Sequence, residues 1–216
     1  MATRSQIVEK AYKCLDEVYP DTPLSSDIDE FHIEDFVDDA IRFIGRVAPV
    51  RALGTGEGFG SKRPTTPSIP SIPVSIAVED TDETENTDET ENTDSVVLPN
   101  GFVRLIAFQM SDWALPVTDA LYSDNPRYRQ QADPILRGTP KRPIVFINGD
   151  RILEYYSSTG SIKKAQAFVV SDTAEYPEQL SEAIAWKTAE LVLSAMNDAQ
   201  GVQFAQAQLK QLLEAL

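Results

Sequence analysis

The sequence predicts an α+β protein, in which helices from both ends of the chain form a bundle and a small antiparallel β subdomain is inserted between them. Residues 33–48 and 177–196 carry apolar side chains at helical spacing. Residues 96–172 contain alternating segments and a hairpin signal, Asn148-Gly149. Between these regions lies a connector without apolar periodicity. We therefore expect four parts: N-terminal helices (1–53), a flexible linker (54–95), the β subdomain (96–172) and C-terminal helices (173–216).

Composition and charge limit the classes of protein to consider. Apolar residues make up 42% of the 216 residues, which is ordinary for a soluble globular protein. The net charge of −15 is uneven: Asp16–Asp39 holds ten acids and Glu79–Asp94 nine, with no Lys or Arg in either segment. Basic residues gather between Arg127 and Arg142. An acidic surface disfavours DNA binding, which requires cations at the phosphates. The charge therefore argues against a nucleic-acid reader.

Membrane and secretory signals are not expected in this sequence. No run approaches the roughly 18 apolar residues of a membrane span, and the first ten residues lack a signal-peptide apolar region. Cys14 is the single cysteine, so it cannot form an internal disulfide. This composition fits a reducing cytoplasm, and Cys14 is expected to act as a small apolar side chain on a helix face.

Two helices are predicted at the N-terminus. Thr3 and Gln6 have capping-box spacing at the start of a helix over residues 3–18. Residues 33–48 place apolar side chains on one face and charged side chains on the other. Asp35, Asp38 and Asp39 lie on this charged face, which we first interpret as a solvated helix surface.

The linker has two compositionally distinct halves. Gly54–Gly60 reads GTGEGFG and lacks the Gly-Lys-Ser/Thr ending of a phosphate-binding loop, so a hinge is expected. The hexapeptide TDETEN then occurs twice, at residues 81–86 and 87–92. Because these repeats have no apolar residue to bury, they predict a disordered, self-repelling acidic loop.

Strands are predicted after the linker. Residues 102–110 alternate at period two, and residues 144–147 and 151–156 flank Asn148-Gly149, whose residues both accept positive φ. A further strand is expected over residues 165–170. The intervening segment 124–143 is polar and contains five basic residues. It is either an interface element or a polar surface loop held by its prolines.

The C-terminal region predicts a core helix followed by a second helix. In the core helix over 177–196, polar residues occupy one narrow stripe, and Trp186 belongs to the apolar side. The last helix either continues from it or bends at Gly201. Its apolar seam, which includes Leu209, Leu213 and Leu216, either closes the monomer core or contacts a neighbouring subunit.

No constellation in the sequence favours catalysis, a metal or a cofactor. Zinc sites need clustered Cys and His, whereas this chain has one Cys and one His. His32 is therefore expected to be a boundary residue without a catalytic task. The acidic repeat lacks the glycine and ligand spacing of a calcium-binding loop. We expect a protein that is not an enzyme and has no cofactor.

Several stretches together resemble a known family. LPNGFVRLIAFQMSDWALPVTDAL (98–121) and RGTPKRPIVFI (137–147) resemble the middle region of neck proteins of crAss-like and related tailed phages of Bacteroidota. The N-terminal helix that ends in RVAPVRALG and the paired C-terminal helices are similar to head–tail adaptor proteins more widely. The resemblance covers roughly two-thirds of the chain and excludes the Gly/Pro connector and the doubled TDETEN.

The resemblance implies a structural virion protein in the neck between capsid and tail, assembled in the host cytoplasm. Such a protein forms a ring, usually of twelve copies, that contacts the portal and adjacent neck or tail ring proteins while DNA passes through its channel. Interface positions are then expected at exposed aromatics, arginines and the C-terminal seam: Trp113, Tyr128, Arg137, Arg142, Leu209, Leu213 and Leu216. Asp35, Asp38 and Asp39 would face the channel, where negative charge keeps DNA from adhering.

Two other interpretations stay open at this point. The chain could be a cytoplasmic helical module for protein–protein interaction, monomeric or dimeric, whose acidic loop recruits a basic partner. It could also be an enzyme with carboxylate chemistry, which requires a deep pocket with facing carboxylates. Ring formation would favour the connector, whereas stable dimers alone would favour the module.

Overall fold

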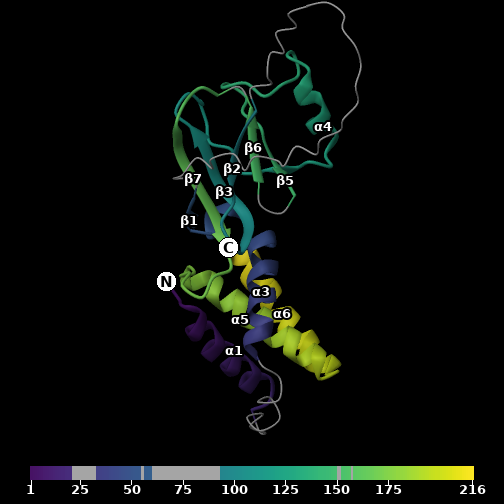
Figure 1. Cartoon of the computed structure of the whole chain (residues 1–216). Helices are drawn as coiled ribbons and strands as arrows, with labels where there is room; N and C mark the ends of the chain where they lie inside the picture. The colour runs from purple at the N-terminus through teal and green to yellow at the C-terminus, as the bar shows by residue number, and fades with distance from the viewer. Residues whose placement is uncertain (21–32, 55, 60–92, 150–151, 157) are drawn as a thin grey trace, which may run out of the picture.

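The computed structural model describes residues 1–20, 33–54, 56–59, 93–149, 152–156 and 158–216. Long helices gather at one end of the molecule and the strands at the other (Figure 1). The predicted α+β class is confirmed. The doubled TDETEN and His32 lie outside the described residues. Among the described helices, none has the length and apolar character needed to cross a membrane.

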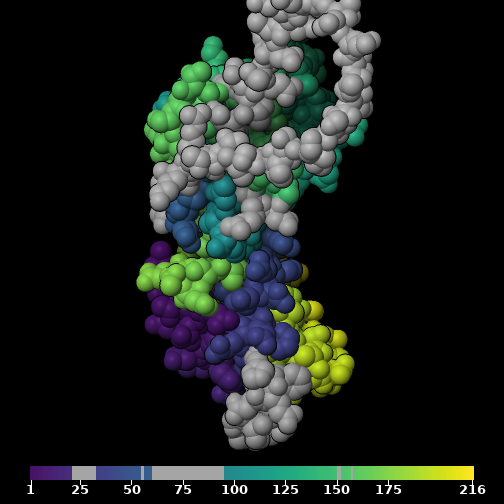
Figure 2. Space-filling view, in the orientation of Figure 1, coloured from purple at the N-terminus to yellow at the C-terminus, as the bar shows by residue number. Residues whose placement is uncertain are grey.

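The helical end is organised around one buried helix. The long helices are α1 (Arg4–Val18), α3 (Ile33–Val47), α5 (Glu178–Ala195) and α6 (Ala199–Ala215). The helix α5 contacts the other three, and Trp186 is only 8% exposed. The predicted core helix is therefore confirmed. The helices α1, α3 and α6 appear side by side in purple, blue and yellow on the face shown in Figure 2.

Local sequence signals set the ends of these helices. Thr3 and Gln6 form the predicted capping box at the start of α1. The break between α5 and α6 falls at Asn197, not at Gly201, which lies inside α6. Asn197 has φ +58°, a left-handed conformation that Asn tolerates after a helix end. Asp198 then caps α6 by accepting from the Gln200 backbone N–H at 3.2 Å.

The strands form two sheets. One has the order β1-β7-β3 and the other β2-β6-β5-β4. Their bounds are β1 (Glu57–Gly58), β2 (Thr93–Val97), β3 (Phe102–Met110), β4 (Leu121–Tyr122), β5 (Val145–Asn148), β6 (Ile152–Tyr156) and β7 (Ile162–Val169). The pairs are antiparallel except β4 with β5, where Leu121 pairs in parallel with Phe146. The expectation of a purely antiparallel subdomain is thus wrong at this pair, because a long excursion separates the two strands and lets the chain return in the same direction.

The linker prediction also needs correction at both ends. Glu57 and Gly58 pair with β7, and residues 93–95 belong to β2. Gly56 has φ +63°, and a Cβ there would lie 2.5 Å from the Ala167 carbonyl oxygen. Only glycine permits this close approach, so part of the predicted hinge is packed against the sheet. The linker that remains, residues 60–92, is outside the described part.

The hairpin between β5 and β6 is confirmed, but its turn differs from the prediction. Asn148 is the last residue of β5 and pairs with Ile152. Gly149 has φ +61°, whereas Asn148 does not adopt a positive φ. The connection is therefore longer than a two-residue turn, and Gly149, not Asn148, supplies a left-handed conformation.

Two hydrophobic clusters form the core. The helical cluster joins the four long helices, and the aromatic cluster lies between the two sheets around Phe108, Trp113 and Tyr155. The strand β3 serves both, since Ile106 belongs to the helical cluster and Phe108 to the aromatic one. Residues 105–110 are consequently all buried, and the strand predicted over 102–110 is confirmed.

Candidate interaction surface

The basic segment after β4 is an ordered loop. Pro126–Arg129 form the short helix α4, and the Asn125 side chain accepts from the Arg127 backbone N–H at 3.0 Å. A 3₁₀ turn, Gln130–Ala132, follows. Gln131 is only 4% exposed; its side chain accepts from the Gly138 backbone N–H at 2.8 Å and donates to the Arg127 carbonyl at 2.9 Å. The loop therefore closes around one buried amide, whose nitrogen and oxygen each make a hydrogen bond to the loop backbone.

This loop encloses an open hollow of about 830 Å³ that is rich in positive charge. Its cations are Arg127, Arg137, Lys141 and Arg142, and we call it the basic hollow. Among the described residues that line it, Asp119 is the one acid. Arg137 is held in place because its Nε donates to the Gln131 carbonyl at 2.8 Å. Cations gathered in a concavity produce a focused positive potential, so the hollow suits a negatively charged partner.

Apolar side chains stand exposed beside these cations. Ile135 is 89% exposed and Leu136 is 56% exposed, and both line the basic hollow. The turn is fixed because the Asp133 carboxylate accepts from the Ile135 backbone N–H at 2.8 Å, and its carbonyl accepts from the Leu136 N–H at 3.1 Å. An ordered turn that holds apolar side chains in water is typical of a contact surface.

The structure brings two of the predicted interface residues together and places the others elsewhere. Arg137 and Arg142 both line the basic hollow. Trp113 is 4% exposed and lies edge-on to Phe108, with ring centroids 5.6 Å apart. Its expected role as an interface anchor is therefore wrong. Within the part of the chain that the structure describes, the buried Trp113 Nε1–H has no hydrogen-bond acceptor.

Tyr128 braces the loop from inside. Its ring lies edge-on to Phe146 with centroids 5.2 Å apart, and its hydroxyl donates to Glu154 Oε2 at 2.9 Å. Asn148 donates to the other oxygen of Glu154 at 2.7 Å. These contacts fasten α4 to β5 and β6. Tyr128 is half-buried, so its contribution to an interface is to position the basic hollow and not to anchor a partner.

The predicted channel acids divide into two groups. Asp35 and Asp39 are exposed on α3. Asp38 instead accepts a hydrogen bond from Arg4 Nε at 3.1 Å, which offsets part of its charge. Phe43 and Val47 continue the row of Asp35 and Asp39 at four-residue spacing. They are 40% and 49% exposed. We call Asp35, Asp39, Phe43 and Val47 the acidic–apolar row.

The C-terminal seam mainly closes the helical core. Leu209 is 6% exposed, and Leu213 and Leu216 are half-buried against the helical cluster. Leu209 and Leu213 also line a groove of about 390 Å³ with Phe43. Inside this groove Lys187 and Glu190 form an ion pair at 2.8 Å. The apolar seam therefore packs on the core of the monomer, which is the first of the two predicted alternatives. A shallow groove lies at its edge.

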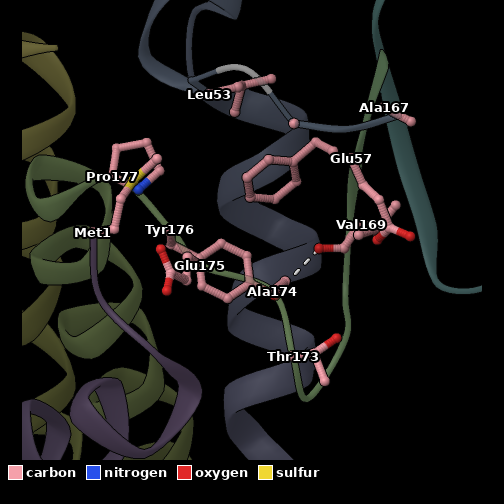
Figure 3. Close-up of a pocket in the computed structure, with 12 residues that line it drawn as sticks. Met1, Leu53, Glu57, Ala167, Val169, Thr173, Ala174, Glu175, Tyr176 and Pro177 are labelled. Atoms are coloured by element: carbon pink, nitrogen blue, oxygen red, sulfur yellow. Dashed lines mark hydrogen bonds between the residues drawn. The ribbon is translucent and has the colours of Figure 1, made fainter. Parts of the chain in front are cut away.

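A second cavity, of about 400 Å³, lies where the helices meet the sheet (Figure 3). Tyr176 and Pro177 line it together with Met1 and Leu53. The Tyr176 hydroxyl donates to the Val169 carbonyl at 3.2 Å, and burial raises the pKa of Tyr176. This hydroxyl therefore stays protonated and serves packing between the two ends of the molecule.

Reactive and metal-binding groups were sought across the described ranges. No three His, Cys, Asp or Glu side chains come together there as metal ligands would. Burial raises the pKa of the Cys14 thiol to about 12, so it remains protonated at neutral pH. The arrangement of exposed groups is best suited to contact with another macromolecule. A comparison with models of known families, with curated proteins and with solved structures finds no match to this chain.

Proposed function

We propose that this chain is a structural virion protein, a head-to-tail connector subunit whose ring bridges the portal and the tail. One observation carries the proposal: the chain exposes a hollow rich in cations in one part of its fold and carboxylates on the first turns of a helix in another. The basic hollow lies beside α4 in the strand region, and the acidic–apolar row lies on α3 in the helical region (Figure 1). The resemblance to neck proteins of tailed phages gives this pair of surfaces a specific context.

Complementary surfaces at different places favour ring assembly. A two-fold dimer uses one patch twice, whereas a head-to-tail contact joins two different patches and can close into a ring. The proposal includes the arrangement expected from the sequence, a helical bundle with an inserted β subdomain. In a ring of such subunits each copy offers its basic hollow to one neighbour and its acidic helix to the other.

The net charge suits a DNA channel. With a charge of −15 per chain, twelve copies would carry about −180, which opposes adhesion of DNA to the ring. Asp16 and Glu17 are exposed acids at the end of α1, outside the acidic–apolar row. We expect Asp16→Lys with Glu17→Lys to slow genome ejection from assembled particles. An unchanged ejection rate would remove the channel-lining role.

The proposed location is tested by finding the chain in purified phage particles. Gold-labelled antibodies and cryo-electron microscopy should place it between capsid and tail, in contact with the portal. If the chain is absent from particles and forms stable dimers that bind a basic cytoplasmic protein, the interaction-module function replaces this proposal. The acidic repeat that this module would use lies outside the described residues.

A further inference from the structure

We propose that the basic hollow is the docking site for the acidic repeat of the same chain. The acidic repeat is residues 81–92, the doubled TDETEN, which holds six acids and no base. Three features of the chain support this docking: the cations of the hollow lack acidic partners among the described residues, the repeat ends close to the hollow, and the two charges are opposite. The docking is a property of one chain, so it goes beyond the proposed connector function.

The cations of the hollow carry charge that the described residues leave unpaired. Arg127, Lys141 and Arg142 are exposed, and Arg137 is half-buried. Across the described residues, the basic side chains that form ion pairs all belong to the long helices, and none of them lines the hollow. The chain has 34 acids against 19 bases. Four unpaired cations in one hollow of such an acidic chain indicate that an acidic segment binds there.

The register of the second sheet places the end of the repeat close to the hollow. The strand β2 begins at Thr93, directly after the repeat, and Thr93 pairs with Tyr156 of β6. On the other side of β6, Tyr155 pairs with Val145 of β5. Ile144, the residue before Val145, lines the hollow. Neighbouring strands lie about 4.8 Å apart, so the chain enters β2 about 10 Å from the lining of the hollow.

The repeat is long enough to cross this distance and fill the hollow. An extended residue spans about 3.3 Å, so about four residues cross the gap and about eight can lie along the cations. Because the repeat is tethered so close, its effective concentration at the hollow is in the millimolar range. Weak individual ion pairs therefore suffice for occupancy. The same tether favours the repeat of the same chain over that of a second copy.

The chemistry of the hollow suits carboxylates on an extended segment. Arginine presents a planar fork of N–H donors that matches a carboxylate, and three of the four cations are arginines. The buried amide of Gln131 and the hydrogen bond from Tyr128 to Glu154 hold the loop in place, so little of its conformational freedom is lost on binding. The proposed ring contact uses the same cations. A neighbouring subunit and the repeat would therefore compete for the hollow.

A synthetic peptide of the repeat, TDETENTDETEN with a fluorescein label, tests the docking by fluorescence anisotropy. It is titrated with the full-length wild-type chain and with a full-length chain whose repeat is neutral. The wild-type chain should bind the peptide about tenfold more weakly than the neutral-repeat chain, because its own tethered repeat occupies the hollow. The neutral-repeat chain replaces each acid of the repeat by its amide: Asp82→Asn, Glu83→Gln, Glu85→Gln, Asp88→Asn, Glu89→Gln and Glu91→Gln.

A surface-neutral chain separates occupancy of the hollow from the overall charge of the protein. It has the same net charge as the neutral-repeat chain but keeps the repeat intact, so it should bind the peptide within about threefold of wild type. Its substitutions replace six exposed acids outside the repeat: Glu9→Gln, Asp16→Asn, Glu17→Gln, Asp35→Asn, Asp39→Asn and Glu182→Gln. Circular dichroism of each variant reports whether its fold is retained.

Substitutions in the neutral-repeat chain locate the bound peptide. Lys141→Glu with Arg142→Glu changes two exposed cations of the hollow and should weaken peptide binding by about tenfold or more, because like charges then face each other. Lys163→Glu with Lys164→Glu changes two exposed cations of β7, outside the hollow. This matched pair should leave binding within about threefold.

The inference is overturned if the neutral-repeat chain does not bind the peptide, or if the Lys141 and Arg142 substitutions leave binding unchanged. Equal binding to the wild-type and neutral-repeat chains also overturns it and leaves the hollow open to an acidic segment of another protein. The titrations are repeated at concentrations where ultracentrifugation shows a monomer. A difference that vanishes there would assign the hollow to the repeat of a second copy, against the inference. None of these results decides the connector function, which is tested by location in particles.

Discussion

The helical and strand regions bury their apolar residues in different ways. The helical cluster is built mainly from Ala, Val, Leu and Ile, and α5 supplies its centre. The aromatic cluster packs Phe108 against Phe59, Trp113 and Tyr155. The strand region also leaves Ile135 and Leu136 in water on an ordered loop. Apolar side chains are also exposed on α3, at Phe43 and Val47. The difference therefore lies in the cores: the helices form a mainly aliphatic scaffold, and the strand region has an aromatic core.

Several well-defined contacts join the two regions, and two of them lie at the end of α3. Gly45 of α3 lies against the Phe168 ring of β7. Arg104 of β3 donates to the Arg46 carbonyl at 3.3 Å and to the Ala48 carbonyl at 2.9 Å. A guanidinium at the carboxyl end of a helix satisfies carbonyls that have no partner within the helix. The end of α3 is thus one place where the two regions are coupled.

The largest expected change in stability comes from removing the Phe108 ring from the aromatic cluster. Phe108 is fully buried, and Phe108→Ala should lower the free energy of unfolding by about 3–5 kcal/mol. Urea unfolding followed by tryptophan fluorescence measures the change. A loss below about 1 kcal/mol would mean that this cluster does not support the strand region as described.

A smaller change in stability is expected from a substitution at the contact between the two regions. A Cβ at Gly45 would lie 2.6 Å from two Phe168 ring atoms, so Gly45→Ala should destabilise the protein by about 1–3 kcal/mol. Helix propensity alone predicts the opposite sign, a gain of about 1 kcal/mol. Thermal unfolding decides between them. Phe168→Leu in the Gly45→Ala background is the control, and it should recover part of the loss by making room.

Removing the hydrogen bond that holds the loop of the basic hollow should change hydrogen exchange only in that loop. Tyr128→Phe keeps the ring on Phe146 but removes the hydrogen bond to Glu154, which is worth about 1 kcal/mol. Hydrogen exchange should become faster at the amides of residues 127–138 and stay unchanged in α5. If hydrogen exchange became equally faster in the loop and in α5, the hydrogen bond of Tyr128 would not act on the loop alone.

The smallest expected effect concerns an exposed ion pair of the scaffold. The hydrogen bond from Lys10 lowers the pKa of Glu178 below its ordinary value of 4.5. Because the folded-state pKa is the lower one, this pair stabilises the fold above pH 4.5, and the stabilisation is lost as the pH falls below that value. Glu178→Gln should therefore flatten the acid limb of the stability curve slightly. An identical acid limb in variant and wild type would contradict the assignment.

Local patterns predicted the elements well where one face of a helix or strand is decisive. The bounds of β3 and the capping box of α1 follow directly from residue spacing. The two-residue strands β1 and β4 could not be predicted, because their pairing depends on distant β7 and β5. The burial of Trp113 likewise results from tertiary packing, which a single exposed-aromatic rule does not capture.

The candidate surface was predicted in part. Arg137 and Arg142 were predicted as interface positions because arginine is enriched at interface hot spots, and both line the basic hollow. Ile135 and Leu136 were missed, since two apolar residues in a polar segment carry no periodicity. The available signal was an apolar pair placed directly after Asp133-Pro134, where a turn can hold it outward. Gln131, which closes the loop, has no signature in the sequence at all.

Removing this chain from an infecting phage tests the central claim most directly. Particles assembled without it should accumulate as separate DNA-filled heads and free tails when counted by electron microscopy. Supplying the wild-type chain in trans should restore joined particles. If heads and tails join at the normal frequency in its absence, this protein is not the connector.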